Sequence, residues 1–100
     1  MMAVLTTKQR QYLRGLAHPL SPIVRVGKAG VTDAVVAETR KSLDSHELIK
    51  VRIEVEEGTE RKELASRLAT ATDAQLAGTI GKIAILYRER AEEPEIKLPR

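Results

Sequence analysis

Residues 48–55 form the clearest pattern in the chain, because aliphatic and charged residues alternate strictly from residue 49 to residue 55. Because successive side chains of a strand point to opposite faces, the alternation predicts a half-buried strand. Residues 23–26, which follow Pro22, predict a second, shorter strand. Residues 76–80 and 83–87 predict two strands joined by Gly81-Lys82, where glycine at the first central position suits a type II′ hairpin turn. The two sides of the long strand are Ile49, Val51, Ile53 and Val55 against Lys50, Arg52 and Glu54.

Three other segments place apolar residues at helical spacing. The first helix begins at Thr6 or Thr7, where Thr6 and Gln9 fit a capping box, and it ends at His18-Pro19. Thr32 or Asp33 caps the second helix, and Gly58-Thr59 ends the long strand and caps the third. The buried stripes are expected to be Tyr12, Leu13, Leu16 and Ala17 in the first helix, Val35, Thr39 and Leu43 in the second, and Leu64, Ala65, Leu68 and Thr72 in the third.

The order of these elements is α-β-α-β-α-β-β, which predicts one α/β domain of the two-layer, α+β-like kind. Two strand–helix–strand units imply parallel strand pairs with right-handed crossovers, and the closing hairpin adds an antiparallel strand. We therefore expect a mixed four-stranded sheet with packed helices over residues 1–88. Residues 89–100 are charged and interrupted by proline, so they form a C-terminal tail that Ile96 and Leu98 could dock.

The charges are distributed unevenly along the chain. The formal net charge is only +3, but residues 1–32 contain no Asp or Glu and carry a local charge of +5. The remaining residues carry a charge of −2. A one-signed N-terminal third predicts a surface that faces a polyanion, although a chance distribution in a slightly basic protein is the alternative. The five cations of this segment are Lys8, Arg10, Arg14, Arg25 and Lys28.

The motif Gly27-Lys28-Ala29-Gly30 lies between a predicted strand and a predicted helix. Two glycines allow the backbone to bend sharply and to approach a ligand, and the helix amides that follow are unpaired donors. With Lys28 these groups predict a phosphate-binding loop, comparable in physics with the G-x-x-G loop of the KH fold. A plain turn between strand and helix is the alternative. The chain lacks the longer glycine motifs of nucleotide-binding enzymes.

The sequence contains little that would support catalysis. Without cysteine it has no disulfide framework, no thiolate metal site and no cysteine nucleophile. His18 and His46 are the only imidazoles, and both are expected at helix ends, outside any pair of nucleophile and base. The cluster Glu54, Glu56 and Glu57 has no histidine to complete a metal site. We expect no enzyme activity, no metal and no cofactor.

Neither a membrane span nor a secretory signal is expected. The chain has no run of 18 apolar residues, and the segment 1–5 is short and uncharged. A cytoplasmic location is the default expectation.

Aromatic residues are too few for a stacking platform, since Tyr12 and Tyr87 are the only two. Both are expected to be half-buried. Gly15 lies inside the first helix, where glycine costs roughly 1 kcal/mol relative to alanine, and this indicates a close backbone approach there. Lys50 and Arg52 could extend a phosphate-binding surface, or they could simply be solvated or covered by a helix.

Several separated blocks occur together and in order: LRGLAHPL (13–20), VRVGKAGVT (24–32), HELIKV (46–51), IGK (80–82), ILYR (85–88) and IKLPR (96–100). They resemble the CRM domain family (chloroplast RNA splicing and ribosome maturation), and within it the bacterial single-domain YhbY-like proteins. The resemblance implies an RNA-binding fold similar to the C-terminal domain of translation initiation factor three. It also implies association with precursors of the large (50S) ribosomal subunit. The family's G-x-x-G loop corresponds to Gly27–Gly30, and its basic first helix to the segment 8–14.

The sequence therefore predicts an RNA-binding protein that grips the RNA backbone, with large-subunit ribosomal RNA or a 50S precursor particle as its partner and a role in ribosome assembly. The principal alternative is a protein-interaction module whose basic surface docks an acidic partner. A small phosphate-handling enzyme is a weaker alternative, because no acid–base pair is present. The predicted RNA contacts are Lys8, Arg10, Arg14, Gly27, Lys28, Ala29, Gly30, Lys50 and Arg52.

Overall fold

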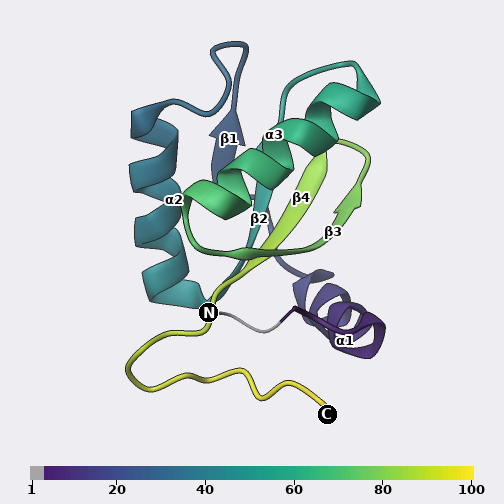
Figure 1. Ribbon diagram of the computed structural model, residues 1–100, viewed down its shortest axis with the longest axis vertical. Helices are drawn as coiled ribbons and strands as arrows, with labels where there is room; N and C mark the ends of the chain where they lie inside the picture. Colours follow the sequence, from purple (N-terminus) through teal and green to yellow (C-terminus); the bar gives the residue numbers. More distant parts are fainter. Residues whose placement is uncertain (1–3) are drawn as a thin grey trace.

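The computed structural model describes residues 4–100, and within them three helices surround a four-stranded sheet (Figure 1). The elements follow the predicted order α-β-α-β-α-β-β, which confirms the fold class. Their bounds are α1 (Thr7–Ala17), β1 (Val24–Val26), α2 (Asp33–His46), β2 (Leu48–Ile53), α3 (Gly58–Ala71), β3 (Gln75–Ile80) and β4 (Ile83–Tyr87).

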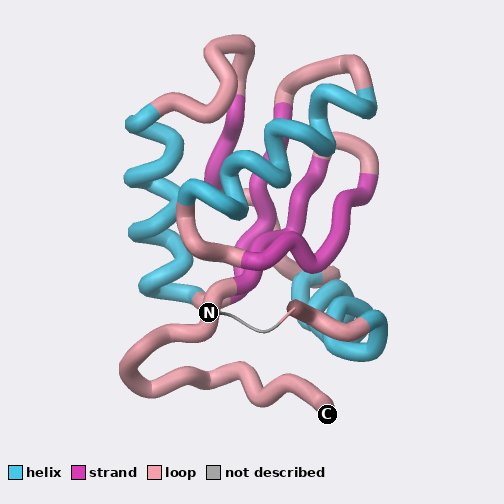
Figure 2. The backbone as a smooth tube through the Cα atoms, in the orientation of Figure 1, coloured by secondary structure: helices cyan, strands magenta, loops and turns pink. Residues whose placement is uncertain are grey.

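The strands lie in the order β1-β2-β4-β3 (Figure 2). β1 and β2 pair in parallel, and β4 pairs antiparallel with both β2 and β3. The second predicted pair, β2 and β3, runs parallel, because both strands are antiparallel to β4, but the two strands are not neighbours. β4 lies between them. The reason is visible in the composition of β4: Ile83–Tyr87 is apolar throughout and almost entirely buried, and a strand apolar on both sides favours a central position.

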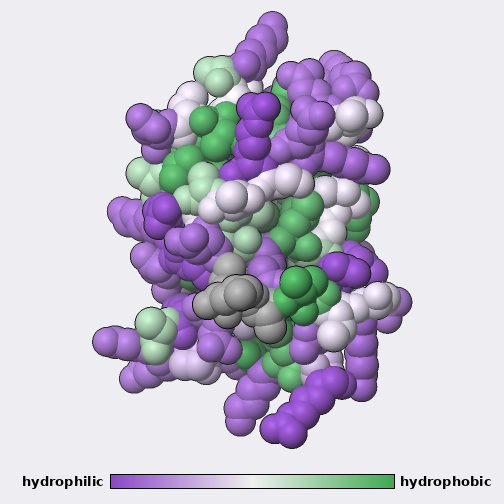
Figure 3. Space-filling model, viewed as in Figure 1, coloured by the Kyte–Doolittle hydropathy of each residue, from purple (hydrophilic) through white to green (hydrophobic). Residues whose placement is uncertain are grey.

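The two faces of the sheet support two separate cores. On one face the aliphatic side of β2 packs with Leu43 of α2 and Leu68 of α3, and both are fully buried. Apolar surface on this side gathers between α2 and α3, while their outer sides are hydrophilic (Figure 3). On the other face a smaller core lies beneath α1, and Ile96 and Leu98 pack against it, which is the docking that the sequence left open. Its buried members include Leu13, Leu48, Ile85 and Tyr87.

Side-chain caps fix where each helix begins. The capping box of α1 is confirmed: the Thr6 hydroxyl accepts from Gln9 N at 3.1 Å, and Thr6 N donates to Gln9 Oε1 at 3.0 Å. For α2, Thr32 is the cap, because its hydroxyl accepts from Val35 N at 3.2 Å. The predicted cap of α3 is wrong by one residue. The Glu57 carboxylate caps this helix by accepting from the amides of Thr59 and Glu60.

Several local expectations are wrong. In α1 the buried residues are Leu13 and Ala17, whereas Tyr12 and Leu16 are 42% and 40% exposed. Nothing approaches Gly15, since a Cβ built on it would meet no other atom within 4 Å. β2 ends at Ile53, two residues earlier than the alternation predicts. The chain leaves the sheet there because β1, its parallel neighbour, ends at Val26, the partner of Ile53.

Tyr87 is buried rather than half-buried, at 3% exposure. Its hydroxyl has no hydrogen-bond partner among residues 4–100. Burial raises the pKa of Tyr87 to about 12, and the neighbouring carboxylates of Glu89 and Glu47 act in the same direction. The phenol therefore stays neutral and serves as part of the core beneath α1.

A buried carboxylate ties the C-terminal segment to the sheet. Glu47, between α2 and β2, is 1% exposed and accepts three backbone hydrogen bonds, from Arg90, Glu95 and Ile96, at 2.7–3.0 Å. Burial raises the pKa of Glu47, but the three amide donors, helped by the charge of Arg90, lower it more, so the net shift is downward. The segment after β4 is thus held by a carboxylate that remains ionised.

Candidate nucleic-acid interface

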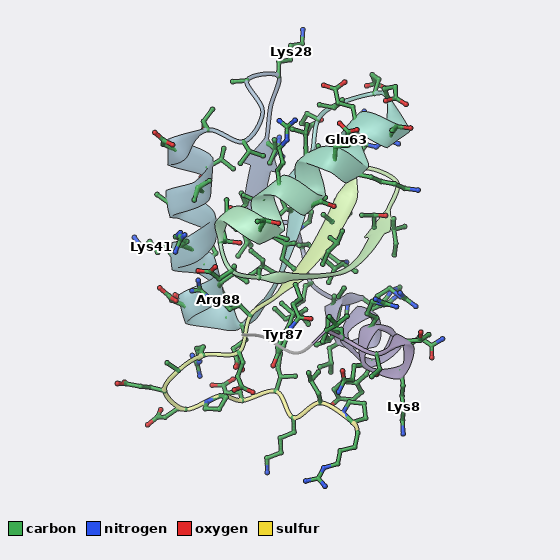
Figure 4. The ribbon with its side chains drawn as sticks, in the orientation of Figure 1. Lys8, Lys28, Lys41, Glu63, Tyr87 and Arg88 are labelled. Atoms are coloured by element: carbon green, nitrogen blue, oxygen red, sulfur yellow. The ribbon has the colours of Figure 1, made fainter. Side chains whose placement is uncertain are left out.

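The Gly27–Gly30 loop joins β1 to α2 and forms one tip of the molecule, with Lys28 at its apex (Figure 4). Gly30 N donates to the carbonyl of Gly27 at 3.0 Å and closes a tight turn. The amides of Lys28 and Ala29 have no hydrogen-bond partner among residues 4–100. Two adjacent backbone donors beside one mobile ammonium group can together bind an anionic oxygen.

The two glycines of the loop have different reasons to be glycine. Gly30 has a φ of +77°, which side-chain-bearing residues rarely adopt, so the turn itself requires it. Gly27 has no positive φ, and a Cβ built on it would meet nothing within 4 Å. The fold therefore does not explain Gly27, whereas a ligand that approaches the backbone closely would.

On the face of the sheet opposite α2 and α3, the structure brings three cations together. Arg25 of β1 pairs in register with Arg52 of β2, and Lys50 lies two residues before Arg52 on the same face. Glu54 contacts both arginines, at 2.6 Å from Arg52 Nε and 4.0 Å from Arg25 Nη1. One carboxylate thus orients two guanidinium groups and leaves a net positive charge, with the Arg25 side chain 78% exposed.

Arg14 reaches this face from α1. Its side chain lies across β3, where a Cβ built on Gly78 would be only 2.8 Å from Arg14 Cδ. Its guanidinium donates to the carbonyl of Ala77 at 3.4 Å. Lys50 makes a comparable link, since its Nζ donates to the carbonyl of His18 at 3.2 Å. Both cations therefore lie at the border between α1 and the open part of the sheet.

The predicted contacts do not form one compact cluster. Lys8 and Lys28 lie toward opposite ends of the longest axis of the molecule, which measures 36 Å (Figure 4). Arg10 lies on α1, where Lys8 is exposed and Arg10 half-buried. The sheet cations lie between the two ends. A single phosphate cannot contact all of these groups, but an extended polyanion can.

Four of the five N-terminal cations have no ion pair with another described residue. Among residues 4–100, no ion pair involves Lys8, Arg10, Arg14 or Lys28. Arg25 is the exception, because it pairs with Glu54. Some later cations, such as Lys41 and Lys62, also have no ion pair among the described residues. Charges without an internal partner are the ones available to a polyanion.

Sequence reasoning left two residues out of the site. Arg25 had a readable signal, because it lies between Val24 and Val26 and must point away from the core they enter. Gly78 had none, since its role depends on Arg14, a residue 64 positions earlier, lying over it.

Among residues 4–100, no helix is long and apolar enough to cross a membrane. Comparison with known proteins matches the model of the CRS1 / YhbY (CRM) domain to residues 5–88. The chain belongs to the CRM domain family. This CRM domain is 42% identical over 99 residues to a Haemophilus influenzae protein named RNA-binding protein, covering 99% of each chain. It is 38% identical over 96 residues to the Bacillus subtilis protein named "Probable RNA-binding protein YqeI", covering 96% of this chain and 100% of that one.

A solved structure agrees with the fold of the CRM domain. The solution structure of the Staphylococcus aureus protein SAV1595, described as a candidate RNA binding protein, superimposes with a TM-score of 0.86 at 41% identity. The match covers 96% of this chain and 100% of that protein. The two proteins therefore share the fold over 96% of this chain.

Proposed function

We propose that this CRM domain binds RNA through a basic strip, defined as Arg14, Arg25, Lys50, Arg52 and the Gly27–Gly30 loop. One observation carries the proposal: two loop amides without a hydrogen-bond partner lie at the end of a row of cations. Arg14 and Lys50 have no acidic partner, and Arg25 and Arg52 share the carboxylate of Glu54. Lys8 and Arg10 extend the strip along α1. The names of the Haemophilus and Bacillus relatives support RNA as the ligand class.

The contacts of such a strip go chiefly to phosphates, which fix register and carry little sequence information. The bound RNA is large-subunit ribosomal RNA, encountered in 50S precursor particles, and the domain acts in ribosome assembly in the cytoplasm. It works as a binding module without a cofactor and without turnover. The resemblance of the sequence blocks to the CRM family supports this finer assignment.

Salt dependence of RNA affinity tests the strip. If about 4–6 phosphates are neutralised, the logarithm of affinity falls with the logarithm of salt concentration at a slope of about −3 to −4. The Lys28→Ala variant should lower affinity for unrelated RNAs alike and make the slope less steep by about 1. Fluorescence anisotropy with a labelled hairpin RNA measures both quantities.

Lys41→Ala is the matched control. Lys41 is exposed on α2, far from the strip, and it makes no ion pair among residues 4–100 (Figure 4). Both variants remove one positive charge, so a general charge effect would weaken them equally. If the two variants bind RNA with equal affinity, Lys28 and its loop do not contact the RNA.

The ribosomal assignment has its own test. Crosslinking the protein to RNA in cells, followed by sequencing of the bound fragments, should recover large-subunit ribosomal RNA. Sucrose gradients should place the protein with particles lighter than mature large subunits. Recovery of a protein complex free of RNA would instead support a docking module for an acidic protein.

A further inference from the structure

An apolar groove opens beside the basic strip. It lies between the end of α1, the segment that leads into β1, the start of β2 and the C-terminal segment, and it has a volume of about 420 Å³. Three of its wall residues, Leu16, Leu20 and Ile23, are 40–46% exposed. They are half of the large hydrophobic side chains exposed among residues 4–100. The floor is completed by Leu48 and Ile96.

The polar side chains that line this groove include one cation, Lys50. Lys50 Nζ donates to the carbonyl of His18 at 3.2 Å, which holds the ammonium group at the groove. His46, at the end of α2, also lines the groove. One carboxylate, that of Glu95, also lines the groove, but it pairs with Arg90 at 3.2 Å. An apolar hollow beside the ammonium group of Lys50 complements a nucleotide, whose flat base is weakly polar on its faces and whose phosphate is anionic.

The groove and the Gly27–Gly30 loop lie along one line. Ile23 is exposed, Val24 is buried and Arg25 is exposed, so Ile23 and Arg25 share the outer face of β1, and Gly27 follows two residues later. At roughly 3.3 Å per residue, the path from Ile23 to Lys28 is about 17 Å long. This length accommodates a few nucleotides of a single strand, with the groove at one end and the unpaired amides at the other.

We propose that the groove receives one unstacked nucleobase of the bound RNA, while Lys50 and Arg25 hold the neighbouring phosphates. The inference rests on the proposed function and narrows its ligand to RNA with unpaired nucleotides, such as a loop or a bulge. The bases of an uninterrupted duplex are stacked and paired, so they cannot enter.

The test compares three RNA probes of equal length: an oligouridylate, the same sugar–phosphate chain without bases, and a perfectly paired duplex. The oligouridylate should bind roughly five- to tenfold tighter than the abasic chain, which carries the same charge, because the base buries apolar surface in the groove. The double variant Leu20→Ser/Ile23→Thr should lose this difference while its affinity for the abasic chain stays the same. Leu20 and Ile23 are 40% and 46% exposed and lie outside the buried core, so the melting temperature should change little.

Ile80→Thr is the control, because Ile80 is 64% exposed on β3 and does not line the groove. It should keep the full preference for bases. If the wild type binds the oligouridylate and the abasic chain equally well, the groove does not bind a base, while the proposal that the protein binds RNA still holds. A preference that persists in the double variant would overturn it as well. If the wild type binds none of the three probes, RNA binding itself is wrong and the inference falls with it.

A second copy of the chain is the other possible occupant. Sedimentation at increasing concentration should show a monomer for both the wild type and the double variant. If the wild type forms a dimer and the double variant is a monomer, the groove serves self-association, and the proposal that it binds a nucleobase is contradicted.

Discussion

At the scale of single residues, Gly27 and Gly30 of the same loop have different reasons to be glycine. Gly30 is required by its positive φ, whereas Gly27 is constrained neither by backbone conformation nor by a neighbouring atom. A residue that the fold leaves unconstrained, beside two unpaired amides, points to the ligand as the reason for its identity.

Alanine at each position should separate the two roles. Gly30→Ala should lower the free energy of unfolding by about 1 kcal/mol, because alanine is strained at this φ. Gly27→Ala should leave stability unchanged or slightly higher, and it should weaken RNA binding because a methyl group obstructs the approach to the amides. Urea denaturation and anisotropy titrations measure the two effects. An RNA affinity of Gly27→Ala equal to that of the wild type would show that nothing approaches the loop closely.

Glu47 makes stability depend on pH in a defined direction. Its pKa is lowered in the folded state from an ordinary value of 4.5, so the ionised form stabilises the fold at neutral pH. The contribution is present above pH 4.5 and is lost as the pH falls through the lower folded value. Glu47→Gln should cost about 1.5–3 kcal/mol at pH 7, the strength of hydrogen bonds to a charged group.

Thermal unfolding between pH 7 and pH 3 checks this account of Glu47. The difference in melting temperature between wild type and Glu47→Gln should shrink as the carboxylate becomes protonated. A constant difference over the whole range would mean that the charge of Glu47 is not what holds the C-terminal segment.

At the scale of elements, α1 is attached to the sheet partly by a contact that needs a glycine. Arg14 crosses β3 directly over Gly78 and reaches the carbonyl of Ala77. Its position therefore depends on the absence of a side chain on the strand beneath it. This packing places one cation of the basic strip at the border of the open sheet face.

A double-mutant cycle tests the attachment of α1. Gly78→Ala should destabilise the wild type by about 1 kcal/mol, because the methyl group would displace Arg14. In the Arg14→Ala background the same change should be close to neutral. Additive effects in urea denaturation would show that Arg14 and Gly78 do not contact each other.

Periodicity and capping residues were enough to predict the presence and order of the helices and strands of residues 4–100, although not the cap of α3 or the end of β2, because these signals come from residues close in sequence. The alternation of β2 and the Thr6–Gln9 capping box are examples. The position of β4 in the sheet was not predicted, although its unbroken apolar sequence carried a signal for it. The roles of Glu47 and Gly78 could not be predicted, because their partners lie more than 40 residues away along the chain.

At the scale of the whole molecule, the cations of the acid-free segment 1–32 are spread along one surface and do not form a compact cluster. Lys8 and Lys28 lie toward opposite ends of the long axis, and the sheet cations fill the space between them. The outer sides of α2 and α3 carry their own cations, such as Lys41 and Lys62. The central claim is therefore about which face of the molecule meets RNA.

The most direct test is a map of backbone amide chemical shifts during titration with a hairpin RNA whose loop is unpaired. We predict that the amides of Arg25, Lys28, Ala29 and Arg52 shift progressively, while those of Lys41 and Lys62 do not. Saturating shifts confined to α2 and α3, with the Gly27–Gly30 loop unchanged, would contradict the account.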